Sequence, residues 1–407
     1  MQHAVVRRVW PVVWRVALLA LGAVAVHKQV RDGNDFPIYW QAARELLAGH
    51  TPYDVASGLH GYVYLPWFAW ALVPLAWLPL AFAAWVWYVA NLAFTWVAGR
   101  RLLAAMRAAG VPTRPETIVL AALPLAGLFH DNLVLGQANL LVLLLVALTV
   151  CGAARGLPLG FATALKMSAA VLALPLALRA QRRGLLGTAL ALALALGLPL
   201  LVPGGIDRLG EWRAKVIAPA AAGTLQGSKV IDQSPQSALR RLLVAEPAFG
   251  ERAVNVAALD PPAFALVSRV TSIVFLVGYA IVWLLAPARA SPRARLLDLA
   301  LGCCAMVQLT GFNLKAQFVV LLLPAWLAAS LAWERPARVQ QAALVIGGAL
   351  FLLSQPGLVG RTASNWMLAC SSMTLGTIIL AKVLAWQRLR LPPSAAPAAA
   401  PAPGTAP

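Results

Sequence analysis

Long apolar stretches, separated by short polar ones, occupy most of the chain. Each is close to the ~20 residues that a helix needs to cross a membrane. The pattern predicts about twelve membrane-spanning helices, at residues 10–27, 63–79, 81–99, 117–130, 139–154, 157–178, 185–203, 268–286, 297–312, 316–333, 339–356 and 366–386. Residues 63–99 are too long for one helix, and Pro79 divides them into a hairpin. We therefore expect an all-α polytopic membrane protein in which residues 1–390 form one domain.

Two polar segments between the apolar stretches are long enough to be substantial loops, 28–62 and 204–267. The last residues, 391–407, are rich in proline and alanine and predict a disordered cytoplasmic tail. Composition agrees with a membrane protein. Of the 407 residues, 61% are hydrophobic and only 12% are charged, about half the charge of a soluble domain.

The net charge of +19 bears on how the chain is oriented in the membrane and not on its fold class. Basic residues anchor the loops of membrane proteins at anionic headgroups, so we expect membrane lipids rather than nucleic acid as partners. With the N-terminus in the cytoplasm, the inside loops collect Arg179, Arg182, Arg183, Arg289, Arg293, Arg295, Arg335, Arg338, Lys382, Arg388 and Arg390. The segment 100–116 carries four arginines but falls outside on this count. Either the 63–99 hairpin is miscounted, or the rule is broken locally.

Carboxylates gather in the two long loops, which face outward on this topology. They hold ten of the fourteen acidic residues: Asp32, Asp35, Glu45, Asp54, Asp207, Glu211, Asp232, Glu246, Glu251 and Asp260. Anchoring does not require carboxylates on one side of the membrane, so we look for chemistry there. The four cysteines and the histidines have no metal-ligand spacing, and we expect the cysteines to be small packing residues.

The first outer loop predicts one short helix. Asp35 suits its N-cap, Pro37 its first turn and Gly49 its C-terminal cap. Phe36, Trp40, Ala43 and Leu47 would share a face that lies down in the membrane interface. A carboxylate at this depth is either a simple cap or a general base toward an acceptor hydroxyl, and Asp32 is a rival for that role.

The order of short motifs is similar to that of a known family. After the first apolar stretch come Ala-Arg-Glu-Leu-Leu-Ala-Gly-His-Thr-Pro-Tyr-Asp (43–54) and Tyr-Leu-Pro (64–66). Then follow Leu-Gly-Gln-Ala-Asn-Leu-Leu (135–141), Gly-Phe-Ala-Thr-Ala-Leu-Lys (160–166), Asp-Gln-Ser-Pro-Gln-Ser-Ala-Leu-Arg-Arg (232–241) and Asn-Leu-Lys-Ala-Gln-Phe-Val-Val-Leu-Leu-Leu-Pro (313–324). Over about residues 30–330 the chain resembles glycosyltransferase family 87, which includes mycobacterial mannosyltransferases of phosphatidylinositol mannoside synthesis.

The resemblance implies a GT-C-like bundle with an active site at the outer face of the bacterial cytoplasmic membrane. Such enzymes move a hexose, usually mannose, from a polyprenyl-phosphate carrier to an acceptor hydroxyl on a lipid or glycan, with inversion at the anomeric carbon. The family's catalytic aspartate corresponds to Asp35. Neither a nucleotide sugar, a cofactor nor an obligatory metal is expected.

Two departures from the family pattern concern the phosphate site. Many relatives have His where this chain has Gln317, which donates hydrogen bonds but carries no charge. Lys315, two residues earlier, is the candidate to supply that charge. The middle motif reads Asp-Gln-Ser-Pro-Gln-Ser where relatives often show Asn-Gln-Ser followed by Leu.

Further candidates each have a simpler structural explanation. Lys166 and Lys315, in or near apolar stretches, either bind a phosphate or snorkel to an interface. Arg240 and Arg241 either clamp a phosphate or face headgroups. Tyr39, Tyr64 and Gln233 are weaker candidates for sugar or acceptor contact. The amides of Gln137 and Asn139 fall on the inner side of our topology, so we expect them to be structural, and Asp131 to be a cap or loop residue.

Two other function classes remain open. A transporter or lipid flippase would also explain the apolar stretches and Lys166, and should show a site at the membrane midplane. A non-catalytic relative of the family would be consistent with Gln317, and should show the outer cavity filled by side chains.

Overall fold

The computed structural model describes residues 2–32, 34–54, 61–221, 229–286, 291–334 and 337–391. Helices form nearly all of this part of the chain, and it contains no β-strand, only isolated bridges between Asp232 and Leu314 and between Phe249 and Arg252. The predicted all-α class is therefore confirmed for the described residues. The predicted tail, apart from Leu391, lies outside them.

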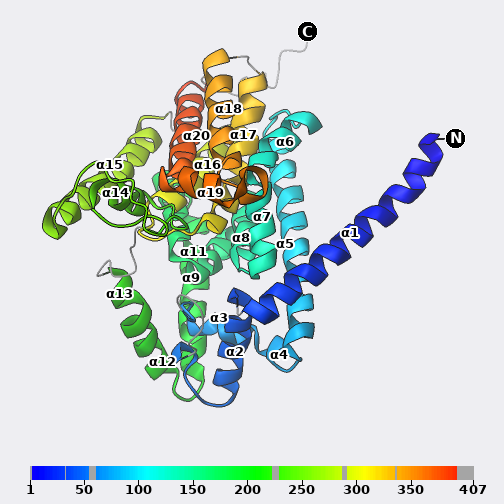
Figure 1. Ribbon diagram of the computed structural model, residues 1–407, viewed down its shortest axis with the longest axis vertical. Helices are drawn as coiled ribbons and strands as arrows, with labels where there is room; N and C mark the ends of the chain where they lie inside the picture. Colours follow the sequence, from blue (N-terminus) through cyan, green and yellow to red (C-terminus); the bar gives the residue numbers. More distant parts are fainter. Residues whose placement is uncertain are drawn as a thin grey trace, which may run out of the picture.

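The helices form a single elongated bundle (Figure 1). Their bounds are α1 Gln2–Asp32, α2 Asp35–Leu47, α3 Pro66–Ala71, α4 Val73–Ala76, α5 Leu80–Ala108, α6 Pro115–Ala122, α7 Ala126–Leu135, α8 Asn139–Val150, α9 Leu157–Leu165 and α10 Ala173–Leu178. They continue with α11 Arg182–Gly197, α12 Gly205–Trp212, α13 Ala218–Ala221, α14 Pro235–Leu243, α15 Pro261–Leu285, α16 Pro292–Gln308, α17 Leu322–Glu334, α18 Arg338–Leu352, α19 Pro356–Ala369 and α20 Ser372–Leu389. Short 3₁₀ segments used below are η2 Leu123–Leu125, η4 Met167–Leu172 and η7 Lys315–Leu321.

Fewer helices than expected are long and apolar enough to cross a membrane. Among the described residues five pass by length and hydropathy: Leu80–Ala108, Pro115–Leu135, Arg182–Leu201, Pro261–Leu285 and Lys315–Glu334. A sixth is possible if α18 and α19, bent by 90° at their junction, are one broken span. The chain is thus an all-α membrane protein, whereas the bounds of the outer loops stay predictions.

The apolar run 63–79 is not a membrane-spanning helix. Pro66 begins α3, Pro74 lies in α4 and Pro79 precedes α5, so the chain turns every few residues. Helix α5 then crosses the bundle alone and brings 100–116 to the end that holds the basic loops. There Arg293 donates to the carbonyl of Ala109 (3.1 Å) and pairs with Glu334 (3.0 Å). The predicted hairpin was miscounted, and 100–116 no longer breaks the positive-inside pattern.

The apolar run 157–178 reverses direction at Lys166 instead of crossing. Lys166 has an extended backbone (φ −140°, ψ 108°) between α9 and η4. Both ends of the run lie beside Gly184 of α11. Gly156, just before α9, lies against the Gly184 carbonyl, and Leu176 of α10 lies beside Gly184. Both ends of the run therefore lie at the same end of the bundle. Neither this run nor 63–79 crosses the bundle, so the count of crossings falls by two. An even change leaves the N-terminus and the predicted cytoplasmic tail on the same side.

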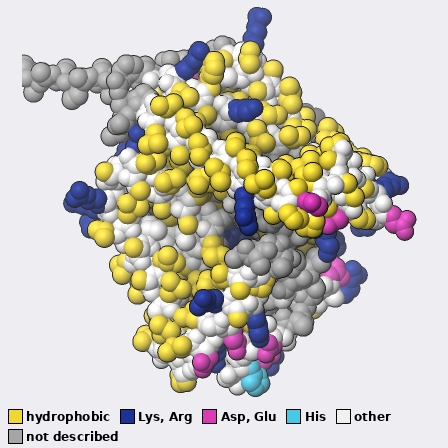
Figure 2. Space-filling model, turned by 90° about the vertical axis from the view of Figure 1, so that its left-hand side faces the viewer, with side chains coloured by type: hydrophobic (Ala, Val, Ile, Leu, Met, Phe, Trp, Pro, Cys, Tyr) yellow, Lys and Arg dark blue, Asp and Glu magenta, His cyan; other side chains and the backbone are white. Residues whose placement is uncertain are grey.

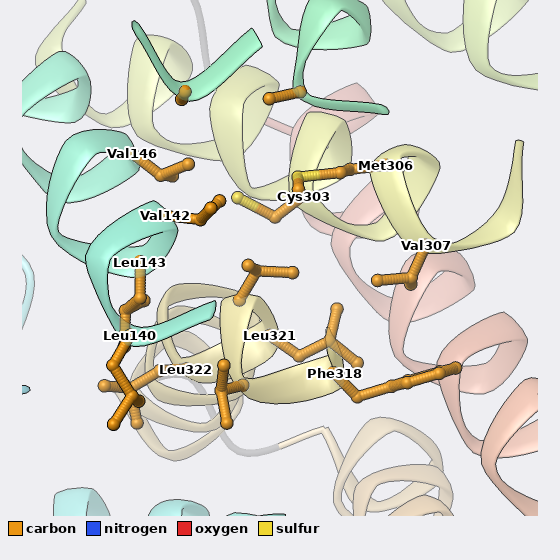
Figure 3. Close-up of a cluster of buried hydrophobic side chains, with 14 of the residues drawn as sticks. Leu140, Val142, Leu143, Val146, Cys303, Met306, Val307, Phe318, Leu321 and Leu322 are labelled. Atoms are coloured by element: carbon orange, nitrogen blue, oxygen red, sulfur yellow. The ribbon is translucent and has the colours of Figure 1, made fainter. Parts of the chain in front are cut away.

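The core forms where α8 and α16 pack around η7. Figure 3 shows Leu140, Val142, Leu143 and Val146 of α8 facing Cys303, Met306 and Val307 of α16, with Phe318, Leu321 and Leu322 beside them. All of these side chains are buried. Cys303 and Cys304 are packing residues as predicted, but Cys151 and Cys370 are exposed, and all four are free thiols.

Acidic side chains are unevenly distributed over the surface. On the face in Figure 2, hydrophobic side chains cover much of the body, and acidic side chains gather toward the lower end and over one side. At the end formed by the outer loops, Lys215 pairs with Asp54, and Thr51 donates to Glu211. The two outer loops therefore contact each other.

Candidate active site

Helix α2 begins at Asp35, one residue earlier than the sequence predicts. Asn34 occupies the N-cap position with an extended backbone, and Asp35 is the first helical residue rather than the cap. An anionic side chain in the first turn is stabilised there by the unpaired N–H groups and the helix dipole. Gly49 follows the C-cap Ala48 with φ +82°, which a glycine adopts without strain.

The buried face of α2 matches the predicted one only in part, since Phe36 and Ala43 are buried and Trp40 is half-buried. Tyr39, Ala42 and Leu46 are buried, whereas Leu47 is 45% exposed. The helix packs against α3, α4 and α5. Phe36 stacks on Trp87 of α5 with ring centroids 5.6 Å apart. This packing fixes the position of Asp35, which lies next to Phe36 in the chain.

Two tyrosines lie within electrostatic reach of Asp35. The Tyr39 and Tyr64 hydroxyls are 3.0 Å apart, and their rings meet edge to face. Burial raises the pKa of both hydroxyls above the usual value, and the charge of Asp35 raises the pKa of each further. They therefore remain neutral and able to donate hydrogen bonds beside the carboxylate.

Lys166 faces the same carboxylate from the apex of the α9–η4 hairpin. The Asp35 carboxylate acts electrostatically on the Lys166 ammonium. The ammonium donates to Asn139 Oδ1, and the Asn139 amide donates to Gln137 Oε1. A cation and an anion from distant segments thus lie together, with an amide relay holding the cation.

The amides of Gln137 and Asn139 are therefore not remote, contrary to our expectation. Gly136, with φ +68°, packs so closely on α2 that an added Cβ would lie 2.6 Å from the Cβ of Phe36. Trp87 Nε1 donates to the Gly136 carbonyl at 2.8 Å. The expectation failed because the run 63–79, counted as a crossing before α7, reversed the apparent side of the segment that joins α7 to α8.

A second charged pair lies next to this segment. Lys315 pairs with Asp131 at 2.7 Å, and neither side chain is more than 23% exposed. Asn132 donates to the Ala316 carbonyl at 2.8 Å, which fixes η7 against α7. Asp131 is thus an ion-pair partner rather than a simple cap or loop residue. Gln317 is half-buried one turn into η7.

The middle motif is joined by its backbone to the segment that carries Lys315. Gln233 N donates to the Asn313 carbonyl (2.9 Å), and Lys315 N donates to the Ile231 carbonyl (3.1 Å). The Gln233 side chain is fully buried and donates to the carbonyls of Val230 and Leu368. Gln233 therefore fixes the loop in this structure.

The two arginines of the middle motif are engaged by the protein itself. Arg241 is buried and donates to the carbonyls of Ala369, Lys229 and Asp232 and to the hydroxyls of Ser237 and Ser371. Burial lowers the pKa of Arg241 to about 10. Arg240 forms a two-point contact with Glu246. A phosphate role for either one stays a prediction.

The structure thus brings Asp35, Tyr39, Tyr64 and Lys166 together and places Lys315 in an adjoining cluster. The rival Asp32 is exposed and bonded to Arg31. Among the described residues, no group of three His, Cys, Asp or Glu side chains is arranged to hold a metal ion.

Comparison with known proteins agrees with the motif order. The model of glycosyltransferase family 87 matches residues 62–311, which is more than half of the chain. Asp35 precedes the matched region, whereas Lys166 and the middle motif lie inside it. No curated protein and no solved structure matches the chain significantly.

Proposed function

The chain belongs to glycosyltransferase family 87, and on that premise we propose that it transfers a hexose from a polyprenyl-phosphate carrier to an acceptor hydroxyl. The proposed reaction takes place at the outer face of the bacterial cytoplasmic membrane. The observation that carries the proposal is that Asp35 lies within electrostatic reach of Lys166 at the end of the bundle where the outer loops lie. A base and a cation at one site suit an attack that creates an anionic leaving group.

In the proposed reaction Asp35 is the general base. Its carboxylate accepts the proton of the acceptor hydroxyl as the acceptor oxygen bonds to the anomeric carbon. The bond between that carbon and the phosphate oxygen breaks on the opposite face, so the configuration inverts and polyprenyl phosphate leaves. The Lys166 ammonium stabilises the charge that develops on the leaving phosphate. The position of Asp35 in the first turn of a packed helix places its side chain where a helix N-terminus stabilises negative charge.

The remaining candidates have secondary roles in this proposal. Lys315 and Gln317 contact the carrier phosphate, and Lys315 exchanges its Asp131 partner for the donor. Tyr39 and Tyr64 present hydroxyls to the sugar or the acceptor beside Asp35. Gln233, Arg240 and Arg241 hold the loop that carries this cluster.

The donor class is tested with purified protein and radiolabelled hexose. Short-chain polyprenyl-phosphate mannose and GDP-mannose are offered separately with extracted membrane lipids and glycans as acceptors. We expect transfer from the lipid-linked donor and none from the nucleotide sugar. Transfer from the nucleotide sugar alone would contradict the proposal, as would the absence of transfer from mannose and glucose carriers alike.

A further inference from the structure

An apolar groove lies far from Asp35, toward the basic end of the bundle. It has a volume of about 500 Å³ and is walled by α6, η2, α17, α18 and α20. Small residues, among them Ala121, Ala325, Gly347 and Gly348, keep it open. Leu120 (67% exposed) and Val345 (63%) border it, so it opens toward the surroundings of the bundle.

Arginine side chains lie at the mouth of the groove and in the segments around it. Arg114, which is exposed, lines it just before α6 begins. The exposed Arg107 and Arg338 lie in the adjoining segments of the same end. Glu116 shares the mouth, but it lies in the first turn of α6, where the helix N-terminus stabilises a carboxylate. This arrangement suits an anionic headgroup above an apolar chain.

The length of the groove matches one leaflet. From Arg114 to Leu125 its wall rises about 16 Å at 1.5 Å per residue. Half of a hydrocarbon core of about 30 Å is about the same. At the deep end, Phe351 lines the groove and meets Phe318 with ring centroids 6.0 Å apart, both almost fully buried.

We propose that this groove binds one anionic phospholipid from the leaflet at the Arg114 end. One acyl chain lies between α6 and α18, and the headgroup phosphate contacts Arg114. By the positive-inside pattern that leaflet is the cytoplasmic one. The lipid joins α6 to α18, whose end at Leu352 precedes the bend into α19. The proposed transfer reaction is not required for this site.

The chain-binding half is tested by native mass spectrometry of the whole protein after detergent washing. The probes are phosphatidylglycerol and phosphatidylcholine with identical acyl chains. We expect one phosphatidylglycerol per chain to be retained, and Ala121→Phe, which fills the groove, to lower that retention at least tenfold. Val119→Phe is the matched control, because Val119 lies on α6, is 64% exposed and does not line the groove. Ala325→Leu fills the opposite wall if Ala121→Phe does not fold.

The headgroup half is tested with Arg114→Gln against Arg100→Gln, an exposed arginine of α5. The first variant should lower phosphatidylglycerol retention about fivefold and leave phosphatidylcholine unchanged, and the second should change neither. Equal retention of the two lipids by the unmodified protein would overturn the proposal. It would also be overturned if Ala121→Phe and Val119→Phe behaved alike, or if polyprenyl phosphate displaced the phosphatidylglycerol.

Discussion

Lys166 is held by side chains rather than by its own helix. It lies at the reversal between α9 and η4, bonded to Asn139, which in turn bonds to Gln137. In a protein interior a charged group without partners is costly, and this relay gives the Lys166 ammonium its partners. In our proposal Lys166 therefore contacts the substrate, and Asn139 positions Lys166.

Lys166→Met should lower the rate of transfer about 10²–10³-fold, which is typical of losing one preorganised stabilising group. Asn139→Ala should have a smaller effect on kcat, and Asn139→Asp should restore part of it because a carboxylate also accepts from Lys166. Asn91→Ala is the control, since Asn91 is a buried amide that donates to the Trp87 carbonyl. Steady-state kinetics measure all four variants. Equal rates for Asn139→Ala and Asn91→Ala would remove the positioning role.

Variants of the Asp131–Lys315 pair test whether Lys315 binds the carrier phosphate or forms only a structural ion pair. Lys315→Met should raise the KM for the carrier, whereas Asp131→Asn leaves Lys315 charged and should not raise it. If the pair is only structural, both variants should lose stability and leave the KM unchanged. A double-mutant cycle of unfolding free energies should give a coupling of about 0.5–3 kcal/mol in either case. Donor titrations and thermal unfolding provide the two readouts.

At the scale of elements, close backbone approach holds the α9–α10 hairpin against α11. A Cβ on Gly156, at φ +94°, would lie 2.0 Å from the Gly184 carbonyl oxygen. Gly156→Ala should therefore destabilise the protein by more than about 3 kcal/mol, from strain and overlap together. Gly152→Ala is matched, because Gly152 also has a positive φ (+68°) but nothing within 4 Å. It should cost only about 1–2 kcal/mol. Similar losses of unfolding free energy would contradict this packing.

The sequence predicted helix α2 and the apolar segments well. It did not predict which apolar segments turn back instead of crossing the bundle. Apolar composition is the same in a crossing helix and in a re-entrant hairpin, so 157–178 appears as one span. The signals were present: Lys166 lies near the middle of that run, and Pro66, Pro74 and Pro79 divide 63–79. The misplaced arginines of 100–116 also indicated an error. Had they decided the count, Gln137 and Asn139 would have been expected on the side of Asp35.

At the scale of the whole molecule, the two ends of the bundle differ in charge and in role. Arg293 and Glu334 lie with Gly110 at one end, and the outer loops with Asp35 lie at the other. The bundle therefore positions lipid-facing helices between a basic end and an end with most of the carboxylates. This arrangement suits a donor whose carrier lies in the membrane and whose sugar faces outward.

The native exposed cysteines test this orientation directly. Cys151 donates to the Arg101 carbonyl at the basic end, and Cys370 follows the carbonyl of Ala369 that Arg241 binds near the outer loops. In intact cells a membrane-impermeant maleimide should label Cys370 and not Cys151. Cys370→Ser should abolish the labelling, and permeabilised cells should add Cys151. Labelling of Cys151 in intact cells would reverse the proposed sidedness.

Transfer of labelled hexose from short-chain polyprenyl phosphate by Asp35→Asn, compared with Asp32→Asn, tests the central claim most directly. The two carboxylates lie three residues apart, but Asp32 is exposed and bonded to Arg31. We predict that Asp35→Asn lowers kcat about 10²–10⁴-fold while carrier binding and folding are retained, because a general base contributes that much. Asp32→Asn should retain nearly full activity. Undiminished transfer by Asp35→Asn, or an equal loss in both variants, would contradict the assignment of Asp35 as the base.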